Sequence, residues 1–318
     1  MMLICLLPFK VSANLVIEIT QGAEGALPVA VVPFKWTGPA AELPLHDVGK
    51  IISDDLKRSG RFSPLTEDKM LSRPSSNDTV DFRDWRVIGI ENLVVGLVQP
   101  NSTGGYLINF KLYDVYRGEQ ITGFSVPTTA RSLRTTAHQI ADTIYETLTG
   151  EKGAFATRIA YVTSIKKGGQ KTIALKIADA DGYNPETIVE SKEPIMSPAW
   201  SPDGQKLAYV SFEKRQPAIY IQEVYTGRRV KITSFKGING APAWSPDGRN
   251  LAMTLSKDGN PDIYVMNLNT KKLRKLSKHW GIDTEPAWSP DGKYIVFTSD
   301  RSGLPQVYRV PVSGGSPE

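Results

Sequence analysis

The spacing of hydrophobic residues changes part-way along this chain. Before about residue 151, apolar side chains recur every three or four positions in two segments. This spacing predicts helices over residues 45–56 and 133–148, followed by the helix-ending glycines Gly60 and Gly150. Short β-rich runs predict strands at residues 15–19, 29–34, 93–99, 106–115 and 120–126. The prediction for residues 14–151 is an α+β N-terminal domain in which two helices cover a mixed sheet.

In the second half, a seven-residue motif replaces this mixed pattern. Pro-Ala-Trp-Ser-Pro-Asp-Gly stands at residues 198–204, 242–248 and 286–292, a period of 44. Ser-Pro-Asp-Gly is typical of a tight turn, because proline presets the backbone and aspartate bonds nearby amides. Each turn is followed by three β-rich runs, so one repeat predicts four antiparallel strands. A four-stranded unit of this length is typical of a propeller blade.

The repeats predict an all-β propeller over residues 152–318 that does not close. Its first unit offers only three strand-like runs, at residues 158–163, 171–179 and 186–191, with no Pro-Ala-Trp strand before them. The sequence ends where the last strand of the fourth unit is expected. We therefore expect three blades plus most of a fourth, in a C-terminally truncated chain. The motif tryptophans are expected to pack between blades.

Charge and cysteine content narrow the function classes. The formal net charge is +5, but lysine and arginine are spread along the chain, so no nucleic-acid partner is expected. The single cysteine, Cys5, lies in an apolar start that is followed by Val11-Ser12-Ala13. This pattern predicts a secretory signal peptide over residues 1–13; the alternative is a buried N-terminal strand. No apolar stretch approaches the roughly 20 residues of a membrane span.

No catalytic constellation is visible. Gly-x-Ser-x-Gly, His-Glu-x-x-His and phosphate-binding glycine motifs are absent from the sequence. The three histidines are scattered and are expected to be solvated or core residues: His46, His138 and His279. The repeated aspartates are expected to stabilise turns rather than bind metal: Asp203, Asp247 and Asp291. We predict no catalytic residue, cofactor or metal, and no enzyme activity.

Together, the predicted signal peptide, the α+β domain and the Pro-Ala-Trp-Ser-Pro-Asp-Gly blades resemble the TolB family of the Tol-Pal system. Further matching segments are Gln21-Gly22, Val31-Val32-Pro33-Phe34, Leu148-Thr149-Gly150, Arg158-Ile159-Ala160-Tyr161-Val162 and Pro305-Gln306-Val307-Tyr308. The resemblance implies a six-bladed ring and a periplasmic scaffold, peripheral to the outer membrane through its partners. It implies binding of the Pal lipoprotein at the channel mouth, communication with TolA, and roles in outer-membrane integrity, protein transport and cell division.

Two sets of residues are candidates for these contacts. The residues before the innermost strands are expected to converge at the channel mouth and face Pal: Ser197, Asn239, Gly240, Ala241, Asp283, Thr284 and Glu285. Ile238 stands where some family members have histidine. The TolA-linked segment would be an alternating strand able to add to a sheet edge: Leu15, Val16, Ile17, Glu18 and Ile19. The alternatives are ordinary loops at the mouth and, for the segment, a fixed strand of its own domain.

One competing function stays open at this point. Similar Trp-Ser-Pro-Asp-Gly turns occur in peptidase propellers, so the chain is alternatively the propeller half of a prolyl-oligopeptidase-like serine peptidase that lacks its catalytic domain. Coding sequence beyond residue 318 would separate the two: further blades favour the scaffold, and a Gly-x-Ser-x-Gly domain favours the peptidase.

Overall fold

The computed structural model describes residues 25–76 and 78–318. The chain divides into two compact units, with the boundary between Ala156 and Thr157. The predicted signal peptide, Cys5 and the predicted strand at residues 15–19 lie outside the described residues. No helix within the described ranges is both long enough and apolar enough to cross a membrane.

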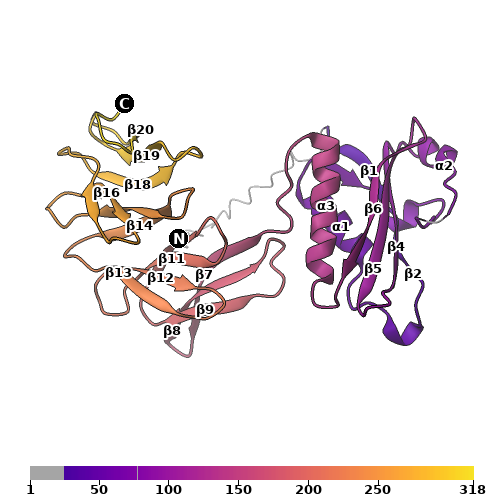
Figure 1. The fold of residues 1–318 in the computed structure, drawn as a ribbon, viewed down its shortest axis with the longest axis horizontal. Helices are drawn as coiled ribbons and strands as arrows, with labels where there is room; N and C mark the ends of the chain where they lie inside the picture. Colours follow the sequence, from indigo (N-terminus) through magenta and orange to yellow (C-terminus); the bar gives the residue numbers. More distant parts are fainter. Residues whose placement is uncertain (1–24, 77) are drawn as a thin grey trace, which may run out of the picture. The chain divides into compact units, whose positions relative to one another are not determined.

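The first unit is built on a single mixed sheet (Figure 1). Its strands are β1 (Leu27–Val31), β2 (Lys35–Trp36), β3 (Phe62–Pro64), β4 (Asn92–Pro100), β5 (Tyr106–Asp114) and β6 (Glu119–Thr128). The order is β3-β1-β4-β5-β6, with β2 also paired to β4. The pairs of β1 with β3 and β4 are parallel, and β4-β5-β6 is antiparallel. The expected mixed sheet is confirmed.

Helices cover both faces of this sheet. Its helical segments are η1 (Ala40–Glu42), α1 (Val48–Arg58), η2 (Glu67–Lys69), α2 (Phe82–Val87) and α3 (Leu133–Thr149). On one face α1 and α3 share a core that includes Ile52 and Ile140, and on the other Trp85 of α2 packs against the sheet. The two predicted helices are confirmed, and α2 was not predicted.

The start of α1 corrects one expectation. Leu45 was placed in the apolar stripe of this helix, but it precedes the helix and is 86% exposed. Asp47 is the reason, because its carboxylate accepts a hydrogen bond from the Lys50 amide at 3.0 Å and caps the helix there. At the end of α3, Gly150 has a φ of 76°, the left-handed conformation expected of a terminating glycine.

The second unit consists of four antiparallel sheets. Their strands are, in sheet order, β7 (Arg158–Lys167), β8 (Gln170–Asp179), β9 (Glu186–Ser191); β10 (Ile195–Trp200), β11 (Lys206–Ser211), β12 (Ala218–Glu223), β13 (Arg229–Thr233); β14 (Asn239–Trp244), β15 (Asn250–Leu255), β16 (Asp262–Asn267), β17 (Leu273–Lys275); β18 (Asp283–Trp288), β19 (Tyr294–Ser299) and β20 (Gln306–Pro311). The predicted propeller blades are confirmed: the first sheet has three strands, the second and third have four each, and the fourth has three.

The motif tryptophans lie between neighbouring sheets, as predicted. Trp200, Trp244 and Trp288 each pack against a core formed by residues of two successive sheets. The indole of Trp244 donates to the carbonyl of Ala199 at 3.1 Å, and Trp288 repeats this bond to Ala243 at 3.0 Å. The buried Trp200 Nε1 has no such acceptor among the described residues. The sheet before it, β7-β8-β9, has no Pro-Ala-Trp strand to offer one.

Candidate partner-binding site

All three innermost strands, β10, β14 and β18, are bulged at the same place. Their pairing register shifts just before the Pro-Ala-Trp motif. Within each bulge a non-glycine residue has a left-handed backbone: Ser197 with φ 49°, Ala241 with φ 44° and Glu285 with φ 53°. This conformation costs roughly 1–2 kcal/mol for an L-residue, and strain that is retained at equivalent positions is characteristic of functional sites. A bulge also re-aims side chains away from the regular pleat.

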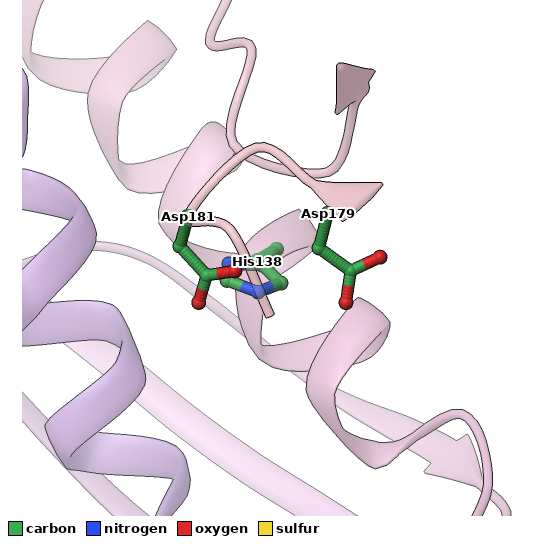
Figure 2. Close-up of side chains that lie close together, drawn as sticks. All are labelled: His138, Asp179 and Asp181. Carbon is green, nitrogen blue, oxygen red and sulfur yellow. The ribbon is translucent and has the colours of Figure 1, made fainter. Parts of the chain in front are cut away.

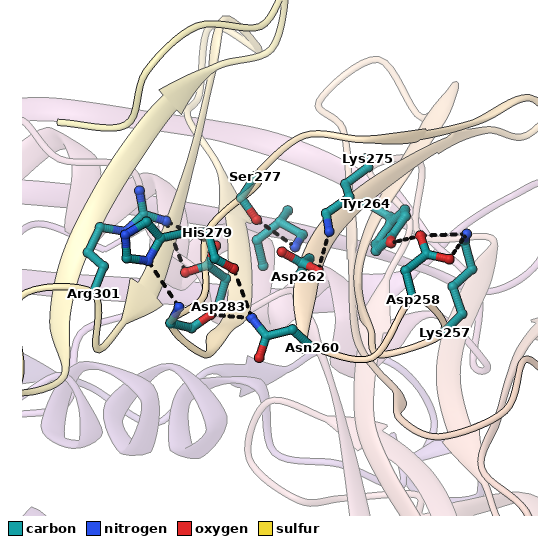
Figure 3. Close-up of polar contacts among 12 residues, drawn as sticks. Lys257, Asp258, Asn260, Asp262, Tyr264, Lys275, Ser277, His279, Asp283 and Arg301 are labelled. Atoms are coloured by element: carbon teal, nitrogen blue, oxygen red, sulfur yellow. Dashed lines mark hydrogen bonds and ion pairs between the residues drawn. The ribbon is translucent and has the colours of Figure 1, made fainter.

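Two of the predicted mouth residues are buried and hold the loops beside them. Asn239, 1% exposed, donates to the carbonyls of Phe235 and Gly237 and accepts from the Phe235 amide. At the equivalent position of β18, the fully buried Asp283 accepts two hydrogen bonds from Arg301, at 2.9 and 3.0 Å (Figure 3). These contacts fix the loops; direct contact of either side chain with a partner stays a prediction.

A pocket of about 350 Å³ is lined by most of the predicted mouth residues. Five of the seven predicted residues line it: Ser197, Asn239, Gly240, Ala241 and Glu285. They come from β10, β14 and β18, so three sheets contribute. Thr284 and Asp283 are not in its lining. A concave, largely apolar pocket with a few polar groups at its edge suits the capture of a single apolar side chain.

Part of this pocket's surface comes from residues that lie outside the motif and its flanking positions, namely Phe212 and Pro217. Met196, Phe212 and Pro217 join Ile238 in the apolar lining. Met196 is 51% exposed and Ile238 45% exposed, which is unusual for apolar side chains beside a pocket. A signal existed in the sequence, because Ile238 and Ile282 occupy equivalent positions one period apart, and Ile282 is 50% exposed. Extending the repeat register outward from the motif would have found Ile282.

The loop before β18 is held by its own hydrogen bonds (Figure 3). Asn260 donates to the carbonyls of His279 and Gly281, at 3.0 and 2.5 Å. The Gly281 amide donates to His279 Nδ1 at 3.0 Å, and the Ile282 amide donates to Asp300 at 2.6 Å. His279, expected to be a solvated or core residue, is half-buried and accepts the Gly281 hydrogen bond within the loop. The loop therefore presents its exposed side chains in a fixed geometry.

Ion pairs stiffen the neighbouring strands. Lys275 lies 2.5 Å from the fully buried carboxylate of Asp262, and desolvation by burial raises the pKa of that carboxyl group. Asp258 is paired with Lys257 and accepts a hydrogen bond from the Tyr264 hydroxyl at 2.6 Å. The hydrogen bond from Lys257 lowers the pKa of Asp258, and burial raises the pKa of Tyr264.

The repeated aspartates stabilise turns, as predicted. Asp203 accepts hydrogen bonds from the Ser201 hydroxyl at 2.5 Å and from the Gln205 amide at 3.0 Å. The same pair of bonds recurs at Asp247 and Asp291. The serine hydroxyl bond lowers the pKa of all three carboxyl groups.

Figure 2 shows His138 on α3 and two acidic residues, Asp179 and Asp181, at the end of β8. His138 is 2% exposed, and its Nδ1 lies 2.5 Å from Oδ2 of the buried Asp55 on α1. It is therefore a core histidine, as expected. Asp181 accepts a hydrogen bond from the Tyr183 amide at 3.0 Å. Because His138 belongs to the first unit and the aspartates to the second, we assign no metal site to them.

Comparisons with known proteins agree with this architecture. The TolB amino-terminal domain matches residues 15–121, and the TolB beta propeller domain matches residues 145–318. A relative named Tol-Pal system protein TolB, from Thioalkalivibrio sulfidiphilus, is 51% identical over 239 residues, covering 75% of this chain and 55% of its own length. Its counterpart from Nitrosococcus oceani is 54% identical over 233 residues, covering 73% and 53%. The chain thus spans about half the length of these relatives.

A solved structure of a relative has the same fold. The crystal structure of TolB from Acinetobacter baumannii superposes with a TM-score of 0.84 at 39% sequence identity, over 95% of this chain and 73% of that one. The propeller model alone matches more than half of the present sequence. The chain therefore belongs to the TolB family.

Proposed function

We propose that this chain acts as a non-enzymatic scaffold of the Tol-Pal system and binds the lipoprotein Pal through the pocket between β10, β14 and β18. The relatives' shared name supports the system. One structural observation carries the site: five residues that were picked from their place before the motif line one pocket, three of them in strained bulges. Family membership favours the scaffold over the peptidase alternative, because an amino-terminal domain model of the same family matches the first half.

The remainder of the proposal follows the family. The signal peptide over residues 1–13 directs the chain to the periplasm, and residues 14–151 and 152–318 are its two functional domains. Residues 15–19, from Leu15 to Ile19, communicate with TolA, while the propeller engages Pal. Through these partners the protein is peripheral to the outer membrane and serves its integrity, its invagination during division and protein transport.

A matched pair of charge insertions tests the site. Ile238, 45% exposed, lines the pocket, whereas Val230, 44% exposed, lies on the outer strand β13. Ile238→Asp places a carboxylate where an apolar group is to be buried, so we expect calorimetric titration with the soluble domain of Pal to show binding weakened by about tenfold or more.

The control Val230→Asp should bind Pal as the unaltered chain does. Absence of any Pal binding by the unaltered chain would refute the proposed function. Equal weakening by both substitutions would leave the function standing but refute the pocket as its site.

A further inference from the structure

Five exposed cations lie at the end of the propeller sheets that carries the pocket. We call the mouth end the loops at residues 192–194, 234–238 and 276–282 together with the hairpins at 212–217, 256–261 and 300–305. Backbone pairing places them at one end: the Phe212 amide bonds to the Pro194 carbonyl, and the Ser256 amide to the Ile238 carbonyl. We call the turn end the opposite one, which carries the Ser-Pro-Asp-Gly turns.

Five of the cations at the mouth end are exposed and make no ion pair within the described part of the chain. None of five basic residues there makes an ion pair with any described residue: Lys192, Lys214, Arg215, Lys236 and Lys278. They come from the loops and hairpins of successive sheets, so the positive charge is distributed around the pocket rather than concentrated on one strand.

Acidic side chains at the mouth end offset only part of this positive charge. Glu213 is bonded to Arg229 at 2.9 Å and to the Tyr220 hydroxyl at 2.7 Å. Asp258 pairs with Lys257. Among the described residues of these loops and bulges, the acids without a cationic partner are Glu193, Glu285 and Asp300, whose carboxylate accepts from the Ile282 amide; they are fewer than the five cations.

The turn end carries charges of both signs as well. Each of its turns carries an aspartate, and their lowered pKa values keep Asp203, Asp247 and Asp291 ionised at neutral pH. Basic residues stand at these turns too: Lys293 lies 3.9 Å from Asp291, and Arg228, Arg249, Lys271 and Lys272 make no ion pair with a described residue. What sets the mouth end apart is that its cations lie beside the largely apolar pocket and an exposed tryptophan.

An exposed tryptophan lies in one of the mouth-end loops that carry these five cations. Trp280 is 74% exposed, beside Ile282, in the loop that Asn260 and Asp300 hold by hydrogen bonds. The loop is also sterically constrained, because a side chain at Gly281 would meet Asp300 at 2.7 Å and the Arg301 backbone at 3.0 Å. A large aromatic held rigidly in solvent loses little conformational freedom on binding and is typical of interface hot spots.

From these observations, and resting on the proposed function, we infer that the mouth end recognises an acidic protein surface surrounding one apolar side chain. The pocket receives the apolar group, Trp280 packs against the partner, and the five cations attract the acidic residues around it. Charge complementarity of this kind accelerates encounter and selects partners. A pocket of about 350 Å³ has the concavity of a side-chain site, which favours a protein over a flat anionic bilayer.

Charge reversal on the two ends provides the test. The double variant Lys236→Glu/Lys278→Glu alters the mouth end, and Arg228→Glu/Lys272→Glu changes the same net charge at the turn end. Binding of the soluble Pal domain is measured by calorimetry in about 0.05 M and about 0.5 M salt. We expect the mouth-end variant to weaken low-salt binding by about tenfold or more, and the turn-end variant by less than about threefold. Added salt should weaken the unaltered chain and largely remove the difference.

Trp280→Ala gives an independent arm, since it leaves charge unchanged and should weaken binding by about tenfold at both salt concentrations. Ile238→Asp could abolish Pal binding while salt, both charge reversals and Trp280→Ala leave it unchanged. That result would overturn this inference while the proposed function stands. No Pal binding at all would overturn both. The chain could also bind phosphatidylglycerol vesicles, with Lys236→Glu/Lys278→Glu losing vesicle binding but keeping Pal binding unchanged. That result would identify the surface as a lipid site and overturn the inference.

Discussion

The two units of the chain are each stabilised by a different kind of internal contact. In the first unit, stabilising contacts are unique: Asp55 on α1 and His138 on α3 meet in the core although 83 residues separate them. In the second unit, the same contact recurs every 44 residues, as the indole bonds of Trp244 and Trp288 show. A unique contact has no substitute when it is removed. A repeated contact can be measured in several places, so the propeller sheets contain their own controls.

Removing the unique contact should have the largest effect. Asp55 is 1% exposed and touches both His138 and Arg58. Asp55→Ala leaves a polar imidazole buried without its partner, so we expect the first unit to lose about 3–5 kcal/mol. Urea unfolding, with hydrogen exchange in α1 and α3 to assign the transition, measures this loss.

The adjacent residue supplies the control. Asp54 forms an exposed pair with Lys50 on the same helix, so Asp54→Ala should change stability by less than about 1 kcal/mol. Similar losses in both variants would show that the buried pair is not what distinguishes the first unit.

The repeated contact should show a smaller and position-dependent effect. Trp244→Phe removes a buried indole hydrogen bond, whereas Trp200→Phe removes an N–H that has no acceptor among the described residues. The loss of ring volume is the same in both, so Trp244→Phe should be the more destabilising by about 1 kcal/mol. Chemical unfolding followed by far-UV circular dichroism measures the difference, and Trp288→Phe should behave like Trp244→Phe. Equal losses at Trp200 and Trp244 would contradict the role assigned to the bond.

The smallest effect concerns pH. In the folded state the serine hydroxyl bonds lower the pKa of Asp203, Asp247 and Asp291 below the ordinary value of about 4. The unfolded chain therefore takes up these protons first, so the stabilisation is present above about pH 4 and is lost as pH falls through the folded pKa values. Replacing all three by asparagine should make the free energy of unfolding depend less on pH below about pH 4. Parallel curves for the variant and the unaltered chain would exclude this contribution.

Repetition also explains how much of the propeller unit was predictable from sequence. Three copies of one motif, each in register with the others, located the innermost strands, the turns and the inter-sheet tryptophans. In the first unit, a long apolar stripe was enough to predict α3. The start of α1 was misplaced because the Asp47 cap overrides the apolar stripe at Leu45. The six-residue α2 offers too few turns for a periodic pattern to show.

The candidate site was only partly predictable for a related reason. The repeat register located five residues that line the pocket. It did not show that Asn239 and Asp283 are buried, because their partners, such as Arg301, lie in loops outside the motif. Trp280 was missed because the equivalent position one period earlier is Lys236. Exposure of a side chain depends on its neighbours in space, which a single repeat pattern does not report.

The proposed function requires that a partner protein bind at the mouth end. Hydrogen exchange of the chain with and without the soluble Pal domain tests it most directly. We predict slowed exchange at residues 234–241 and 278–285, and unchanged exchange at the turns at residues 201–204, 245–248 and 289–292. Protection confined to those turns, or exchange that Pal leaves unchanged at the mouth end, would contradict the account.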